Sequence, residues 1–268
     1  MTVKIYGCRG SVAVSHLDSR YGGNTSCMKV TSGDESIVID AGSGIMLLRD
    51  ELRNNPSSTT NILISHLHLD HIIGLGTFDP AWDKNADVTV FTCSRDERPL
   101  NEQICSIFSP PYWPVSMKDF SAFKAVEIKE DIAFKIGRFT VTPFESGHPD
   151  KTLSFHITDG KKSLVHLLDS EISGLQQDEL DIMEKYCKDA NVVFFDAAYS
   201  SEDYLSFRKG WGHSTVKHGV ELAKEWECKL MVFSHFDQKY SDDELDSWKD
   251  EFSSDKFLMA YDGLELSI

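Results

Sequence analysis

Three imidazoles and one carboxylate fall within six residues of the sequence, as His66, His68, Asp70 and His71 in an H-x-H-x-D-H run. Neutral imidazole and carboxylate are preferred zinc ligands. Alternation along the chain lets His66 and His68 point the same way, so that Asp70 and His71 can turn to a second ion. A histidine-rich surface loop is the alternative interpretation. However, the run directly follows a short apolar strand predicted over 61–65, a placement that a solvated loop does not need.

The run stands at a strand end that opens into a loop. Such a place is usual for chemistry, because the scaffold is rigid and the loop is open to substrate. The run therefore predicts a site that can hold two metal ions.

The elements that must position these residues are predicted by hydrophobic periodicity and turn residues. No linker or low-complexity segment divides the chain, so we expect a single domain over residues 1–268. Its two β-rich halves with helices outside suggest two packed sheets between helical layers. Strands are expected at 3–6, 28–31, 36–39, 61–65, 88–91, 132–144, 153–158, 163–168, 192–195 and 230–233, and helices at 42–54, 175–186, 216–227 and from about 241.

Composition restricts the partners. The chain of 268 residues has a net charge of −16 and no dense Lys/Arg block, whereas binding of long nucleic acid needs a basic surface. A small anionic substrate remains compatible, because bound metal ions reverse the charge locally. The six cysteines form no C-x-x-C pair, and no apolar run approaches the roughly 20 residues that span a bilayer. We therefore expect a cytoplasmic protein with no membrane partner.

The H-x-H-x-D-H run resembles the signature of the metallo-β-lactamase fold superfamily, and the later motifs of that superfamily are matched in order over nearly the whole chain. They are His148 in S-G-H-P, Asp169 in L-L-D-S and His235 in F-S-H-F. Taken singly, His148 or Asp169 could equally be a loop or capping residue. The resemblance implies an α/β fold, an αββα sandwich of two mixed β-sheets flanked by helices. It also implies that one ion takes His66, His68 and His148, while the other takes Asp70, His71 and His235. Asp169 would bridge the ions, and a water or hydroxide would complete both shells. Zinc is the expected metal, although a His/Asp site also accepts manganese or iron.

Further motifs resemble the ribonuclease Z-like phosphodiesterase branch of the superfamily. They are G-H-S-T at 212–215, F-D-A-A-Y at 195–199, and the glycine-containing segments 7–11 and 22–26. In F-D-A-A-Y, phenylalanine and aspartate stand where that branch has the histidine and glutamate of H-E-A-T. Nothing here resembles the long arm with which a tRNA-processing enzyme grips its substrate. The pattern is most similar to small-substrate members, including bacterial cyclic nucleotide phosphodiesterases and phage anti-Pycsar enzymes.

The expected function is therefore hydrolysis of a small phosphodiester, with a cyclic nucleotide as the leading candidate. Asp70 would help to hold the nucleophilic water, and His213 would act as general acid with its ring oriented by Asp196. Ser11 and Asn24 are candidate substrate-binding residues, although Asn24 could instead hold a turn.

Other readings stay open. Within the fold, the alternatives are a lactone or thioester hydrolase and a ribonuclease Z-like RNA-processing enzyme. Di-iron redox proteins of the fold typically have Glu where this chain has His68. Related phosphodiesterases are commonly homodimers, and a Pro-rich excursion at 108–123 could reach a neighbouring chain.

Overall fold

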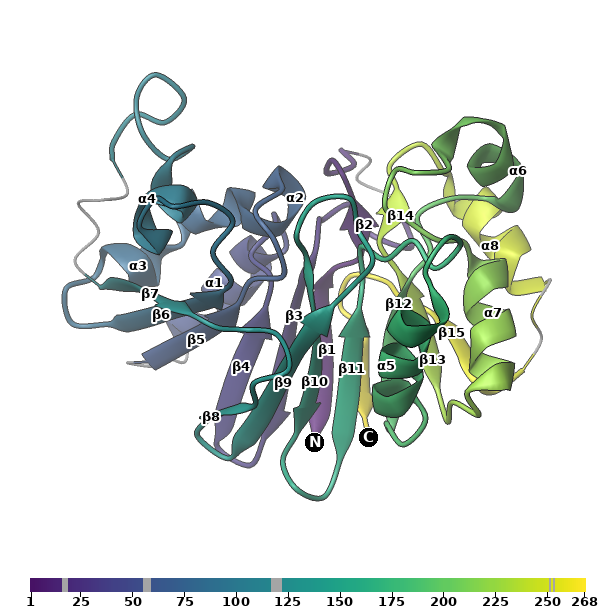
Figure 1. Ribbon diagram of the computed structural model, residues 1–268. Helices are drawn as coiled ribbons and strands as arrows, with labels where there is room; N and C mark the ends of the chain where they lie inside the picture. The colour runs from purple at the N-terminus through teal and green to yellow at the C-terminus, as the bar shows by residue number, and fades with distance from the viewer. Residues whose placement is uncertain (16–18, 55–58, 117–121, 251, 253) are drawn as a thin grey trace.

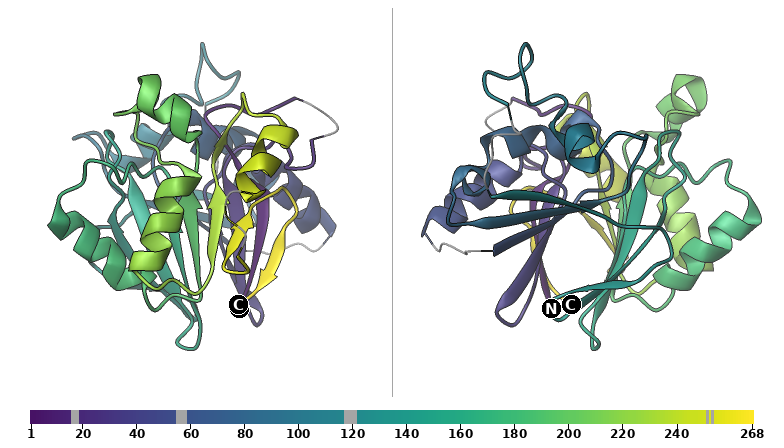
Figure 2. Two further views of the ribbon diagram at one scale, coloured as in Figure 1. Left: turned by 90° about the vertical axis from the view of Figure 1, so that its right-hand side faces the viewer. Right: turned by 60° about the vertical axis from the view of Figure 1, so that its left-hand side comes forward.

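Two seven-stranded β-sheets face each other at the centre of the molecule, and helices cover both outer faces (Figure 1). The computed structural model describes residues 1–15, 19–54, 59–116, 122–250, 252 and 254–268. Figure 2 shows the two sheets edge-on, with helices from the first half of the chain on one side and helices from the second half on the other. The αββα sandwich implied by the motifs is confirmed.

The first sheet is mixed. Its amino-terminal strands are antiparallel, and its remaining strands run parallel from β4 to β7. In spatial order the strands are β16 (Glu265–Ser267), β1 (Thr2–Gly7), β3 (Cys27–Ser32), β4 (Glu35–Ile39), β5 (Thr59–Leu63), β6 (Asp87–Thr92) and β7 (Phe123–Glu127).

The second sheet repeats this plan, with an antiparallel meander followed by parallel strands from β11 onward. A separate parallel pair of two-residue strands, β2 (Arg9–Gly10) and β14 (Phe236–Asp237), joins the amino-terminal loop to the segment after β13. The order in the second sheet is β15 (Phe257–Met259), β13 (Met231–Ser234), β12 (Val192–Asp196), β11 (Ser163–Leu167), β10 (Leu153–Thr158), β9 (Phe139–Glu145) and β8 (Phe134–Ile136).

The helices divide between the two outer layers (Figure 1). On the side of the first sheet lie α1 (Ile45–Asn54), α2 (Leu69–Ile72), the 3-10 helix η1 (Ile73–Thr77), α3 (Asp79–Trp82) and α4 (Leu100–Cys105). On the other side lie α5 (Gln177–Cys187), α6 (Ser201–Asp203), the π-helix η3 (Tyr204–Arg208), α7 (Val216–Glu225) and α8 (Asp242–Asp250). Among the described residues, none of these helices is long and apolar enough to cross a membrane.

Strand periodicity explains how one sheet serves two cores. In β4, Ile37 and Ile39 face the second sheet, whereas Val38 packs on the outer side with Ile45 and Leu48 of α1. Successive side chains of a strand point to opposite faces, so an apolar run can be buried on both. The larger core fills the space between the sheets and continues over the outer face of the second sheet to α5, α7 and α8. Its part between the sheets fixes their separation. It therefore also fixes the distance between loops that leave the two sheets at the same edge.

One predicted element is wrong. Residues 132–144, expected as a single strand, form the hairpin of β8 and β9, which turns at Gly137 with φ +54°. The apolar run continues through the turn, so periodicity alone did not separate the two strands. In the Pro-rich excursion, 108–116 is irregular, with Trp113 packed edge to face on Phe108 and Tyr112 exposed. Residues 117–121 of the excursion lie outside the described residues.

Candidate metal centre

The candidate ligands lie in loops at one edge of both sheets. His66 comes three residues after β5, and α2 begins immediately after His68, which places Asp70 and His71 in its single turn. From the second sheet, the other three follow strands: His148 lies in the loop after β9, Asp169 two residues after β11, and His235 directly after β13. Two sheets thus supply one cluster.

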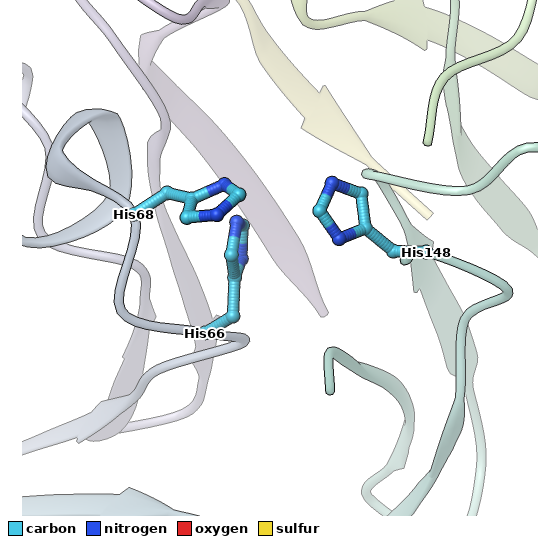
Figure 3. A group of neighbouring side chains, drawn as sticks. All are labelled: His66, His68 and His148. Carbon is cyan, nitrogen blue, oxygen red and sulfur yellow. The ribbon is translucent and has the colours of Figure 1, made fainter. Parts of the chain in front are cut away.

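The first group consists of His66, His68 and His148. Figure 3 shows the three rings turned toward one another, with His148 approaching from the opposite side, and one nitrogen of each lies within 4.8 Å of the others. Hydrogen bonds occupy the remaining nitrogens. His66 Nδ1 is 3.1 Å from Ser65 Oγ, His68 Nε2 is 2.8 Å from an Asp150 carboxylate oxygen, and His148 Nδ1 is 3.2 Å from the Asp150 carbonyl oxygen. This leaves His66 Nε2, His68 Nδ1 and His148 Nε2 for an ion.

The second group consists of Asp70, His71 and His235. His71 Nε2 lies 3.4 Å from Asp70 Oδ2 and 3.2 Å from His235 Nε2, and His235 Nε2 lies 3.2 Å from Asp70 Oδ2. The other nitrogen of His71, Nδ1, donates to Asp40 at 2.7 Å. A buried carboxylate behind a ligand histidine fixes its tautomer and its orientation, so His71 is set to present Nε2 to an ion.

Asp169 lies between the two groups. Its Oδ1 is 3.7 Å from His66 Nε2, while its Oδ2 is 3.1 Å from His71 Nε2 and 3.3 Å from His235 Nε2. Its backbone has φ +51°, a left-handed conformation that is uncommon outside glycine and is often found at functional sites. One carboxylate oxygen therefore faces each group, as a bridging ligand requires.

The donor set fits a pair of divalent cations. Among the described residues, His66 Nε2 and Asp169 Oδ2 are buried ligand atoms with no hydrogen-bond partner, which suits metal ligands. Burial, followed by the neighbouring His71, holds the pKa of His66 well below its ordinary value, so its ring is in the neutral form that binds metal. Burial opposes charge on His235, but Asp169, Asp70 and Asp196 raise its pKa to about 9. The three carboxylates around His235 therefore favour a positive charge at this position.

His213 lies beside the cluster in the loop before α7. Its Nδ1 donates to Asp196 Oδ2 at 2.8 Å, and its ring stacks on His235 with centroids 5.0 Å apart. The same carboxylate of Asp196, at the end of β12, accepts backbone N–H groups from Asp169, Ala198 and Ser214. A carboxylate held at four points cannot swing away, so the orientation of the His213 ring is fixed.

The amino-terminal loop places its two predicted residues differently. The backbone N–H of Ser11 donates to Asp70 Oδ2 at 2.6 Å, which puts Ser11 beside the cluster. The side chain of Asn24 donates to Asp262 and accepts from Ser43 Oγ, so its amide is used within the loop. Within the described part of the chain, neither side-chain polar atom of Asn24 is hydrogen-bonded to a member of the cluster. Its substrate-binding role stays a prediction.

Sequence reasoning missed three acidic residues that shape the site: Asp40, Asp150 and Glu171. Asp40 follows β4 in the run E-S-I-V-I-D, and its position at a strand end was the one available signal. Asp150 bonds both His68 and His148, as described above. Glu171 accepts hydrogen bonds from Tyr204 Oη and from the backbone of Gly210 and Gly212, so it fixes the loop that leads to His213.

Comparisons with known proteins identify the family and the fold. The family model for the Beta-lactamase superfamily domain matches residues 35–236. Ribonuclease Z of Haloarcula marismortui is 21% identical over 309 residues, which cover 99% of this chain and 96% of that protein. The metallo-β-lactamase fold protein YhfI from Bacillus subtilis superposes with a TM-score of 0.76 at 20% identity, covering 99% of this chain and 98% of that one. A diphosphatase from the PhnP family gives a TM-score of 0.72 at 17% identity, covering 100% and 97%.

Proposed function

Since the chain belongs to the beta-lactamase superfamily and is a metal-dependent hydrolase, we propose that it hydrolyses a small phosphodiester, with a cyclic nucleotide as the leading substrate. The ligands would be His66, His68 and His148 for one ion and Asp70, His71 and His235 for the other, bridged by Asp169. The observation that carries the proposal is the hydrogen-bonded pair of His213 and Asp196, which lies beside these seven residues and which we assign to catalysis, not to either ion.

The reaction makes two demands on the site. Two bound divalent ions would supply an activated water at neutral pH and offset the negative charge of the phosphoryl group. The departing alkoxide must also receive a proton, because a sugar alkoxide is too basic to leave readily alone. A positioned general acid typically accelerates such a step about 10²–10⁴-fold. The chain needs a proton donor that binds no metal.

His213 meets that demand. With Nδ1 bonded to Asp196, its Nε2 is the ring nitrogen available to a leaving group. The Asp196 carboxylate holds the orientation of the ring, as a general acid requires. Thr215 caps α7 by accepting from the backbone of His218. The cap therefore does not depend on His213, whose side chain is left for chemistry.

Charge favours a small substrate over a long one. The net charge of −16 opposes binding of a polyanion away from the metal ions, whereas a single phosphodiester can lie within the cluster. Ribonuclease Z among the relatives makes RNA processing the main competitor. The other competing activity is hydrolysis of a lactone or thioester. That reaction releases no sugar alkoxide, so it would not need His213 as a proton donor for one.

A substrate panel tests the proposal. Metal-loaded protein is assayed on 3′,5′- and 2′,3′-cyclic nucleotides, bis(p-nitrophenyl) phosphate, a pre-tRNA, an acyl-lactone and a thioester, with His66→Ala as the inactive reference. We expect hydrolysis of the small phosphodiesters, loss of that activity in His66→Ala, and little turnover of the acyl compounds. Turnover confined to the acyl compounds or to the pre-tRNA would contradict the proposal.

Two finer points belong to the same proposal. Zinc is proposed as the native ion because the ligands are imidazoles and carboxylates, and elemental analysis of protein purified without added metal tests it. A homodimer is proposed by analogy with related phosphodiesterases, and sedimentation equilibrium tests it. Iron or manganese in place of zinc, or a monomer at micromolar concentration, would contradict the respective point.

A further inference from the structure

An exposed aromatic residue, Trp211, lies on the loop that carries His213. Its side chain is 53% exposed, although the guanidinium of Arg208 lies 4.3 Å from its ring centroid. A single exposed apolar residue needs no explanation, but this one is only two residues from His213 in the sequence.

The position of Trp211 is fixed relative to the cluster through its neighbour Gly212. A Cβ placed on Gly212 would lie 2.1 Å from His148 Cδ2, so the backbone here packs directly against that ring. Gly212 also has φ +90°, a conformation that side chains rarely adopt. Glycine at position 212 lets the backbone pass close to the His148 ring. The backbone of the preceding residue, Trp211, is therefore held near that ring.

The loop under the ring is rigidly held. Glu171, which is buried, accepts from the backbone of Gly210 and Gly212 at 2.7 and 2.8 Å, one residue on either side of Trp211. Behind the ring, Arg208 lies 5.0 Å from the centroid of Tyr199, and its Nη2 is 3.6 Å from Asp237. An indole braced by a clamped loop and a guanidinium loses little further freedom when a ligand stacks on it, which favours binding.

We propose that Trp211 stacks on the planar base of the substrate, with Glu171 and Arg208 as its positioning residues. The inference rests on the proposed function, because a cyclic nucleotide has its base one sugar ring away from the phosphate. Every base has a π-face, and stacking on an aromatic side chain is tolerant of sequence. Arg208 on the indole continues the same stack through a cation–π contact. Trp211 therefore selects phosphodiesters that carry a heteroaromatic group.

A binding experiment tests this without requiring turnover. Affinities of the metal-loaded protein for adenosine 5′-monophosphate and for ribose 5-phosphate, which lacks the base, are measured by calorimetry. The native chain should bind the nucleotide more tightly, and Trp211→Ala should remove about 5- to 150-fold of that preference while ribose phosphate affinity stays unchanged. Trp211→Phe should restore part of it. Trp82→Ala, a change at a 41%-exposed tryptophan on α3, is the matched control.

Three other outcomes of the binding experiment overturn the inference. A native chain with no preference for the nucleotide, or a preference that survives in Trp211→Ala, would leave the ring without a stacking role. A change in sedimentation coefficient with the preference intact would assign Trp211 to a contact between chains. Turnover of cyclic nucleotides is measured in parallel, so that absence of hydrolysis with an intact Trp211-dependent preference would count against the proposed function alone. Metal content and circular dichroism confirm that each variant is folded.

Discussion

Asp40 accepts a hydrogen bond from Nδ1 of His71 at 2.7 Å, and both side chains are completely buried. Asp40 also accepts from the backbone N–H and the Oγ of Ser65, and that Oγ lies 3.1 Å from His66 Nδ1. One carboxylate therefore supports His71 directly and His66 through Ser65. Replacing a carboxylate that supports a metal ligand typically costs 10–100-fold in metal affinity or activity.

Asp40→Asn should therefore weaken metal affinity by about 10–100-fold without removing a ligand. The measurement is competition with a chelator of known affinity, and Asp178→Asn, a change at an exposed carboxylate on α5, is the control. Unchanged metal affinity in Asp40→Asn would show that metal binding by His71 does not depend on its hydrogen bond to the Asp40 carboxylate.

Metal removal should abolish hydrolysis. Purified protein is expected to hold close to two ions per chain, and dialysis against a chelator should eliminate activity until metal is restored. Asp70→Ala should reduce the metal content toward one ion, because Asp70 belongs to only one of the two groups. Elemental analysis gives the stoichiometry. Full activity of metal-free protein would refute the whole assignment.

His213→Ala should separate two kinds of substrate. Diesters with an alkyl leaving group are expected to lose about 10²–10⁴-fold in kcat, whereas bis(p-nitrophenyl) phosphate should lose much less because nitrophenolate leaves without a proton. Both ions should remain bound. His213 also lies near Asp169, with Nδ1 3.9 Å from Oδ1, so a ligand role is the competing interpretation. Loss of metal, or equal losses on both substrates, would favour that role.

Duplex DNA and tRNA should bind weakly at physiological salt. The negative surface repels polyanions, and the chain has too few cations to displace many phosphate counterions. Fluorescence anisotropy across a salt series measures both affinity and its salt dependence. Submicromolar tRNA binding with a steep salt dependence would instead support RNA processing.

Stability should depend on pH through Glu51 of α1. Its carboxylate binds Lys29, Lys4 at 2.7 Å and the Tyr6 hydroxyl at 2.5 Å; burial opposes its charge, yet these contacts lower its pKa to about 2. A lowered carboxyl pKa stabilises the fold above the unfolded-state pKa, and that contribution is lost as pH falls toward 2. Glu51→Gln should cost about 1 kcal/mol at pH 7 after solvent screening.

Urea unfolding of the native chain and of Glu51→Gln, measured between pH 7 and pH 3, checks this. The difference in free energy of unfolding should shrink as the solution is acidified. A difference that stays constant over this range would mean that packing of the side chain, and not its charge, is what the substitution removes.

The candidate metal ligands could be predicted from the sequence, but the residue that supports them from behind, Asp40, could not. His66 to His71 were identifiable because ligand types at short spacing follow a strand, and the later ligands because their order along the chain matched a family. The assignment of each ion to its residues, like the single domain over 1–268, stays a prediction. Asp40 was not identifiable, since a carboxylate after a strand is common and its role comes from the packing of α2 against β4.

Among the strands and helices, too, some were predicted from the sequence and others were missed. Strands with a clear apolar core, such as β12, were predicted within a residue of their bounds, because burial dictates composition. Short elements such as β14 and the π-helix η3 were missed. The backbone of β14 is held by pairing with Arg9, and the Tyr204 side chain of η3 donates to Glu171, and no local pattern encodes these distant contacts. Long-range pairing, and not propensity, decides such segments.

The two ligand groups are completed at different times during synthesis. His66, His68 and His148 all precede β10, whereas the group of Asp70 and His71 also needs His235, which follows β13. Metal-binding free energy requires a complete ligand set. The ion held by Asp70, His71 and His235 would therefore stabilise the fold only after β13 has emerged from the ribosome.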